Sequence, residues 1–146
     1  MKLLIISNNI LMLVLAVSMT IAGCSSTEKN EDNVTERVVT SDFILEVTTP
    51  TVLSMGETIK VKGTLKYTGI KPVEVTHGKP IIRFFFSGSD EERNYTDVGY
   101  VTEFKSGQLV EVEDEFMVTK KGKQNLIVDM TADISLTMNP IEILVK

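Results

Sequence analysis

Cys24 is the only cysteine in the 146-residue chain, so its thiol cannot form a disulfide within the molecule. A lone thiol at a membrane can instead be alkylated by a lipid, which forms a thioether. Ala22 and Gly23 directly precede it and are small enough to let an intramembrane peptidase reach the bond between Gly23 and Cys24. These residue types in this order predict cleavage before Cys24 and attachment of lipid to its sulfur.

Residues 1–23 have the three-part layout of a secretory signal, with a positive start at Met1-Lys2 and an apolar run from Ile10 to Val17. The four residues that end at the cysteine, Ile21-Ala22-Gly23-Cys24, resemble a bacterial lipobox. The resemblance implies a bacterial lipoprotein, anchored to the cell membrane by lipid and facing outside the cytoplasm. Two acyl chains suffice for stable anchoring, because each buried methylene contributes about 0.8 kcal/mol. The alternatives are an uncleaved N-terminal anchor and an ordinary signal that ends near a cysteine.

Four carboxylates lie close together in the chain and could include a pair for general acid–base catalysis: Glu111, Glu113, Asp114 and Glu115. At a spacing of two residues in a strand, the three glutamates would instead face water together. Asp114 would then face inward between Val112 and Phe116, unless a bulge turns it outward; inside, a hydroxyl or Arg83 could pair with it. Because the chain has one histidine and no nucleophile elbow, we expect no catalytic residues and no enzyme activity.

Two further groups could bind a metal ion. His77 is the only histidine, and because a histidine ligand needs companions, we expect it to have a structural or incidental role. The acidic loop Asp90-Glu91-Glu92, with Asp97, could hold calcium. It lacks the ordered spacing and the glycine of a calcium loop, which favours a solvated loop. We therefore predict no metal and no other cofactor.

The segment from Pro80 to Phe86 is the strongest candidate for an interaction surface. In a strand it would be apolar on both faces, with Ile82, Phe84 and Phe86 sharing one of them. One interpretation is a central strand that is covered on both sides. The other is an exposed patch in which these three residues, together with the acidic loop at residues 90–92, dock a partner protein.

The elements that would position these residues are strands. From residue 43 onward apolar and polar residues alternate, most clearly through Ile59, Val61, Gly63, Leu65 and Tyr67. Turn-forming residues recur about every ten residues, and no segment keeps a helical period. We therefore predict an all-β fold, an immunoglobulin-like antiparallel β-sandwich of seven to eight strands in residues 43–146.

Charge predicts which strands are neighbours. Lysines 60, 62 and 66 point outward from one predicted strand, and glutamates 111, 113 and 115 point from one face of a later strand. In an immunoglobulin-like sheet the second and fifth strands lie side by side, so we expect these opposite charges to meet. Exposed pairs of this kind select the register more than they stabilise the sheet.

Residues 24–42 are rich in Ser, Thr, Asn, Glu and Asp, which predicts a lipidated flexible tether before the domain. Eighteen coil residues span about 25 Å, enough to hold a small domain clear of the lipid headgroups. Removing residues 1–23 takes away only Lys2, so the mature chain carries 14 of the 15 basic residues against 20 acidic ones. This balance disfavours nucleic acid as a partner and gives no net attraction to anionic lipids.

The stretch from Leu65 to Val75 is typical of a strand, a short turn and a second strand. Over residues 63–128 the chain resembles the intracellular proteinase inhibitor (BsuPI-type) family. The resemblance implies a protease-inhibitor-like domain. The loop at residues 87–94 is long and polar and lies at the end of a predicted strand, so it would be the segment that occupies the active site of a partner. The favoured function is a non-catalytic binding or accessory module for another envelope or extracellular protein. A metal- or ligand-binding lipoprotein is the third alternative.

Overall fold

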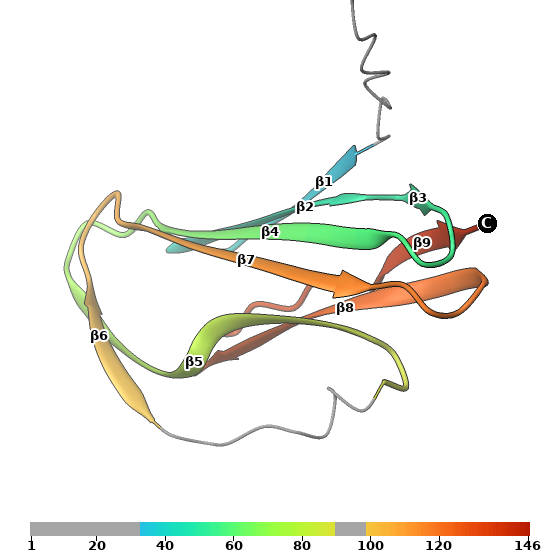
Figure 1. Ribbon diagram of the computed structural model, residues 1–146. Helices are drawn as coiled ribbons and strands as arrows, with labels where there is room; N and C mark the ends of the chain where they lie inside the picture. The colour runs from blue at the N-terminus through green and yellow to red at the C-terminus, as the bar shows by residue number, and fades with distance from the viewer. Residues whose placement is uncertain (1–32, 90–98) are drawn as a thin grey trace, which may run out of the picture.

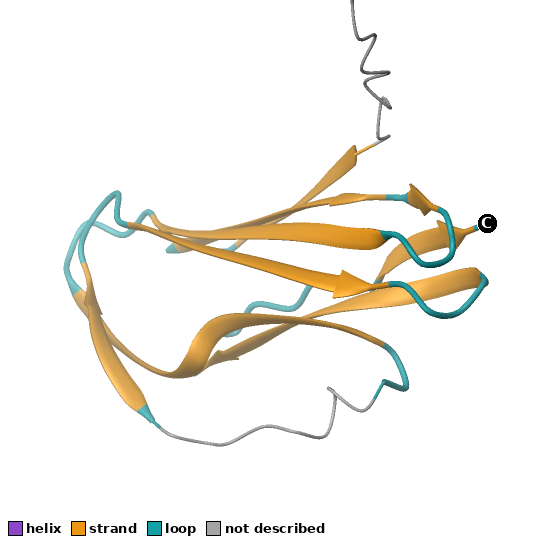
Figure 2. Cartoon of the chain, viewed as in Figure 1, coloured by secondary structure: helices purple, strands orange, loops and turns teal. Residues whose placement is uncertain are grey.

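The computed structural model describes residues 33–89 and 99–146, which form two β-sheets packed face to face (Figure 1). Strands and connecting turns make up the described residues, with no helix among them (Figure 2). Nine strands are present in these two ranges: β1 (Asn33–Val39), β2 (Phe43–Pro50), β3 (Val52–Leu53), β4 (Thr58–Tyr67), β5 (Val73–Phe86), β6 (Tyr100–Phe104), β7 (Leu109–Met117), β8 (Gly122–Ala132) and β9 (Ile141–Val145). In this part of the chain no helix is long and apolar enough to cross a membrane.

The strand order confirms the predicted all-β sandwich. One sheet has the order β1-β2-β4-β7, and the other has the order β3-β9-β8-β5-β6. Neighbouring strands are antiparallel except for β3 and β9, which run parallel. The chain changes sheets between β2 and β3, so a single stretch of residues links both layers.

Strand β1 was not predicted, because residues 33–39 fall in the expected tether. They pair with β2 in a continuous antiparallel register, from Asn33 opposite Pro50 to Val39 opposite Ile44. Val34 and Val38 are partly buried and pack against the core, and the other β1 residues are exposed. The described fold therefore begins at Asn33 rather than at residue 43. Since residues 25–32 are all that separate Cys24 from Asn33, the connection spans at most about 30 Å.

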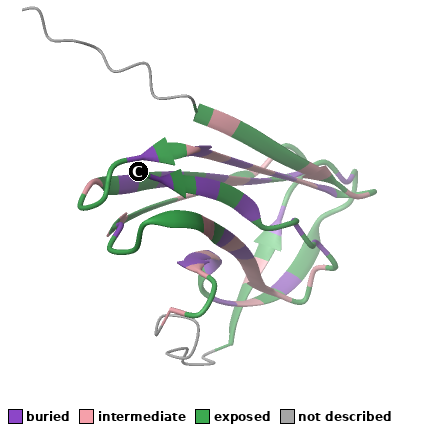
Figure 3. Cartoon of the chain, turned by 90° about the vertical axis from the view of Figure 1, so that its right-hand side faces the viewer, coloured by how far each residue is buried: buried purple, intermediate pink, exposed green. Residues whose placement is uncertain are grey.

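The core lies between the sheets and follows the predicted alternation. Along β4, buried residues alternate with outward-facing ones, and Figure 3 shows such banding on several strands. Burying a large apolar side chain contributes roughly 1.5–3 kcal/mol, so these inward faces supply most of the stabilisation. The sheets approach closely at Gly63, where an added Cβ would lie 2.7 Å from Cζ of Phe84. Glycine at this position makes room for the Phe84 ring.

The predicted charge pairing between strands β4 and β7 is confirmed for Lys60 and Lys62, whereas Lys66 lies opposite Leu109 and has no ion pair among the described residues. Lys60 lies opposite Glu115 in the register, and its Nζ is 3.1 Å from Oε1 of that glutamate. Lys62 Nζ lies 3.1 Å from Oε1 of Glu111 and 3.8 Å from Oε1 of Glu113. All of these side chains are largely exposed, so the pairs fix the register rather than add much stability.

Candidate functional site

The segment from Pro80 to Phe86 is a covered strand, which corrects the idea of an exposed aromatic patch. It forms the second half of β5, where Ile82 has no exposed surface and Phe84 is 5% exposed. The first half of β5 pairs with β6 and the second half pairs with β8, and the other sheet covers its inner face. Of the three residues predicted to dock a partner, only Phe86 is partly exposed.

Asp114 is exposed, although its position in β7 points toward the inside of the sandwich. Its pairing with Val61 of β4 is regular, so no bulge turns it outward. Arg83 does not reach it, because the Arg83 guanidinium pairs with Asp129 instead. Strand β7 is an edge strand, so even its inward side chains lie at the rim of the sandwich, where water reaches them. Both explanations predicted for Asp114 were therefore wrong.

The carboxylate of Asp114 binds the exposed backbone of its own strand. Val118 N–H donates to Glu57 O at 2.9 Å and Tyr67 N–H donates to Gln108 O at 2.9 Å, so the even-numbered residues of β7 direct their backbone groups toward β4. The N–H of Glu115 therefore points to the unpaired edge. It donates to Oδ1 of Asp114 at 2.9 Å. An inward-facing charge that also occupies an edge donor protects the strand against pairing with another chain.

A cavity of about 350 Å³ opens beside this edge, between β7 and the end of β5. We call it the edge cavity. Residues of β5, β7 and the turns after them line it: Phe84, Phe85, Phe86, Ser87, Ser89, Asp114, Glu115, Phe116, Met117, Val118, Thr119, Lys120 and Gln124. Its volume falls within the range of pockets that bind small molecules or side chains. The structure thus places Phe86, and not Ile82, at a surface that could receive a partner.

Two aromatic rings meet across the sheets in the edge cavity. The rings of Phe86 on β5 and Phe116 on β7 have centroids 5.5 Å apart and an interplanar angle of 85°. Both side chains are partly exposed, and Met117 beside them is 64% exposed. The hydroxyl of Ser89 is buried and has no hydrogen-bond partner among the described residues. The cavity therefore combines apolar surface with polar groups that have unused hydrogen-bonding capacity.

The glutamates of β7 face water and pair with lysines, as expected. The hydrogen bond and the charge of Glu111 raise the pKa of Lys62 above its ordinary value of 10.5, and Glu113 adds to the effect. These carboxylates lie on the outer face of the sheet and pair with lysines. They therefore do not converge in a cleft, as a pair for general acid–base catalysis would. The row is an ion-pair ladder along the sheet.

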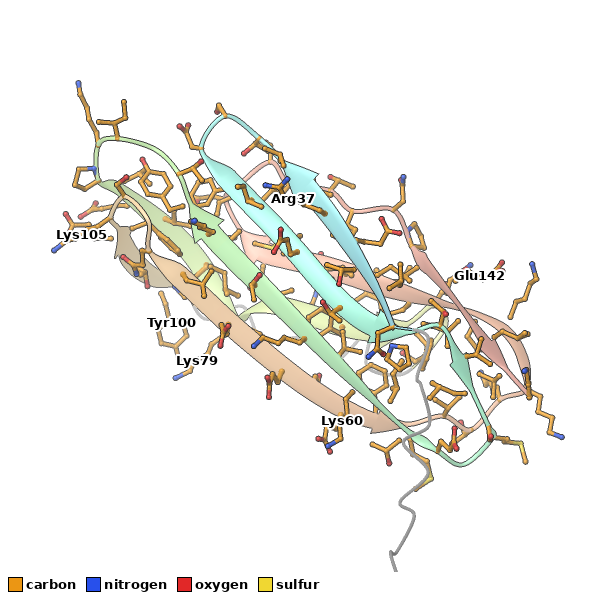
Figure 4. The ribbon with its side chains drawn as sticks, turned by 90° about the horizontal axis from the view of Figure 1, so that it is seen from above. Arg37, Lys60, Lys79, Tyr100, Lys105 and Glu142 are labelled. Atoms are coloured by element: carbon orange, nitrogen blue, oxygen red, sulfur yellow. The ribbon has the colours of Figure 1, made fainter. Side chains whose placement is uncertain are left out.

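His77 lies on β5, away from the edge cavity, and both of its ring nitrogens have partners. Nε2 is 2.8 Å from Oγ1 of Thr102, and Nδ1 is 2.5 Å from the carbonyl oxygen of Gly78. Its ring stacks on Tyr100, and the amine of Lys79 lies 5.9 Å from the centre of the same tyrosine ring. Figure 4 shows Lys79 and Tyr100 side by side. In residues 33–89 and 99–146 no three His, Cys, Asp or Glu side chains gather as a metal site would require.

Several predicted site residues fall outside the described residues. Gly23 and Cys24, with the cleavage and the lipidation predicted there, precede residue 33. The acidic loop Asp90-Glu91-Glu92 and Asp97 lie in the range 90–98, which is also outside. The loop proposed to enter a protease is described only as far as Ser89.

The sequence did not single out Phe116 or Met117 as site residues, and it included Ser89 only as part of the candidate loop at residues 87–94. One signal for them was present, since a charged residue on the inward face of a strand is typical of a sheet edge. Asp114 could therefore have marked β7 as an edge strand, with its neighbours Phe116 and Met117 at the rim. Nothing in the local pattern of Ser89 indicates a buried hydroxyl.

No family model matches the chain, and no curated protein matches it. Two solved structures are similar to it, both of a β-glucosidase from Listeria innocua and one of them in complex with glucose. The first is 15% identical with a TM-score of 0.42, and 71% of this chain covers 16% of that chain. The second is 12% identical with a TM-score of 0.38, and 78% of this chain again covers 16% of that chain. These similarities assign no activity to the protein.

Proposed function

We propose that this protein is a lipoprotein, attached to the outer side of a cell membrane through lipid on Cys24. The observation that carries this proposal is the sequence Ile21-Ala22-Gly23-Cys24 at the end of an apolar signal, with no second cysteine in the chain. Residues 25–32 would then keep the folded domain within about 30 Å of the lipid.

The folded domain acts as a non-catalytic binding or accessory module for another component of the cell envelope, and the edge cavity is its binding site. A concave site with partly exposed Phe86 and Phe116 suits a protein partner, since aromatic residues and methionine are enriched in interfaces. The lining contains hydroxyls, carboxylates and one lysine, with no histidine beside them to act as a base. The alternative is a protease inhibitor whose loop at residues 87–94 enters a protease, and this loop lies outside the described residues beyond Ser89.

Lipid attachment is tested with Cys24→Ser in cells fed a labelled fatty acid. We expect the unchanged protein to take up the label and to sediment with membranes, because the thioether is its anchor. The serine variant should carry no label and should keep the mass of the uncut precursor. Equal labelling of both proteins, or no label and no change in mass in either, would overturn the lipoprotein assignment.

The binding site is tested by placing a photo-crosslinking amino acid at Met117 of the full-length protein in its own cells. Leu109 is the matched control, because it lies on the same strand β7 and is 50% exposed against 64% for Met117, at the end of β7 away from the cavity. We expect a discrete crosslinked partner from position 117 and much less from position 109. The same products from both positions would show that the edge cavity does not select a partner.

A further inference from the structure

Two polar groups of the edge cavity can accept further hydrogen bonds. The Asp114 carboxylate accepts one bond, from Glu115 N–H, and it contacts no cation within the described part of the chain. A carboxylate offers about four lone-pair sites, so most of its capacity remains. The buried hydroxyl of Ser89 adds another oxygen without a partner in this part of the chain. The cavity therefore suits a ligand that carries several N–H donors.

The aromatic rings of the cavity favour a cationic donor. The faces of phenylalanine rings attract cations, and the Phe86 and Phe116 side chains are both partly exposed. A guanidinium group is planar, presents several N–H donors and is more weakly hydrated than an ammonium group. It can stack on a ring and bind a carboxylate at once, which an ammonium group does less well.

The charge of the protein also favours a cation. The chain has 20 acidic residues against 15 basic ones, so it attracts positively charged partners over longer distances. Among the described residues that line the cavity, Lys120 is the one cation. Asp114 and Glu115 are the carboxylates among the described lining residues, so this lining carries a net negative charge.

We propose that the edge cavity binds an arginine side chain from a segment of the partner protein. The guanidinium group donates to Asp114 and to the Ser89 hydroxyl, and its plane and aliphatic stem lie against Phe86 and Phe116. This inference rests on the proposed binding role of the cavity and adds the chemical group that the cavity recognises.

The test is a titration of the full-length protein in detergent micelles with N-acetyl-arginine amide, followed through the backbone amide signals of Glu115 and Phe116 by NMR. N-acetyl-citrulline amide is the matched probe, because it has nearly the same shape and no charge. We expect the arginine probe to shift both signals at millimolar concentration and the citrulline probe to bind at least about tenfold more weakly.

Asp114→Asn removes the charge while keeping an oxygen that can accept from Glu115 N–H, and it should weaken the arginine probe by about tenfold. Glu142→Gln removes a carboxylate that pairs with Lys123 outside the cavity and should leave the binding unchanged. Equal binding of the two probes, or no effect of Asp114→Asn, overturns the proposal. Arg93 follows the lining residue Ser89 in the sequence, within residues 90–98 that lie outside the described part of the chain. Tighter binding of the arginine probe in Arg93→Gln would show that an arginine of this chain competes for the site, and would overturn the assignment to a partner.

This outcome is separable from that of the proposed function. A specific crosslink from Met117, without any preference for the arginine probe, would support the edge cavity as a binding site and would reject only its recognition of a guanidinium group. Binding of the arginine probe without a crosslinked partner would support the recognition of guanidinium by the cavity and would reject the proposed binding of an envelope protein.

Discussion

Phe104 on β6 and Phe116 on β7 occupy the same kind of position, each an inward-facing phenylalanine on the edge strand of a sheet. Phe104 is fully buried, with its ring centroid 5.7 Å from that of Phe43 and 6.4 Å from that of Tyr67. Phe116 is only partly buried, and its one ring contact within the described residues is with Phe86. The sandwich is therefore closed at Phe104 on β6 and open at Phe116 on β7.

The length of β6 explains the difference. Its pairing with β5 runs from Val73 opposite Phe104 to His77 opposite Tyr100 and goes no further. The second half of β5 pairs with β8 on one side, and no described strand lies on its other side. A phenylalanine thus completes a core only where a neighbouring strand covers it. Where the strand stops, the same residue type lines a cavity that can bind a partner.

The largest effect should come from truncating the two phenylalanines. We expect Phe104→Ala to lower the free energy of unfolding by about 3–5 kcal/mol, because it leaves a cavity beside the rings of Phe43 and Tyr67. Phe116→Ala should lower the free energy of unfolding by less than half as much, since water already reaches the Phe116 ring. Chemical denaturation of both variants measures the two values. Equal losses of unfolding free energy in the two variants would show that Phe104 and Phe116 are equally well covered, and would contradict the difference between β6 and β7.

A smaller effect is expected from Asp114→Val, which changes how the open edge is protected. Valine would fit the inward face beside Phe116 and add about 1 kcal/mol of stability through apolar burial. It would also release the N–H of Glu115 to the unpaired edge, so we expect the variant to associate with itself.

Sedimentation velocity over a range of concentrations checks this association. Glu113→Val is the control, because it adds the same side chain to β7 on the outer face and leaves Asp114 in place. A monomeric Asp114→Val protein, or equal association of both variants, would show that Asp114 does not prevent β7 from pairing with another chain.

The smallest effect concerns the outer face of the same strand. The folded pKa of Lys62 is raised above 10.5, so the stability that its pairing contributes is present below that pH and is lost as the pH rises through the folded pKa. Glu111→Gln should remove most of this loss, because Glu111 is the main cause of the shift. Thermal unfolding between neutral pH and pH values above 10.5 measures it, and an unchanged alkaline slope in the variant would disprove the assignment.

Periodicity was enough to predict the fold, because side chains that alternate between core and water leave a direct trace in the sequence. It also gave the neighbours β4 and β7, since opposite charges on two outward faces specify one register. Strand β1 was missed because its residues are mostly exposed and polar, so they resemble a tether. The edge cavity was missed for another reason: it depends on where β6 ends relative to β5, which no single stretch of residues encodes.

Strand β1 has a mechanical consequence for a protein held by its N-terminus. If Cys24 carries lipid as proposed, any pull between the membrane and a bound partner reaches the sandwich through Asn33. Only Val34 and Val38 of this strand pack against the core, so β1 can peel from β2 while the rest of the fold persists. The seven residues of β1 would lengthen the connection between Cys24 and the sandwich by about 23 Å. We expect a first, low-force extension of this size when the protein is stretched from residue 33 with optical tweezers, and its absence would mean that β1 and the core yield together.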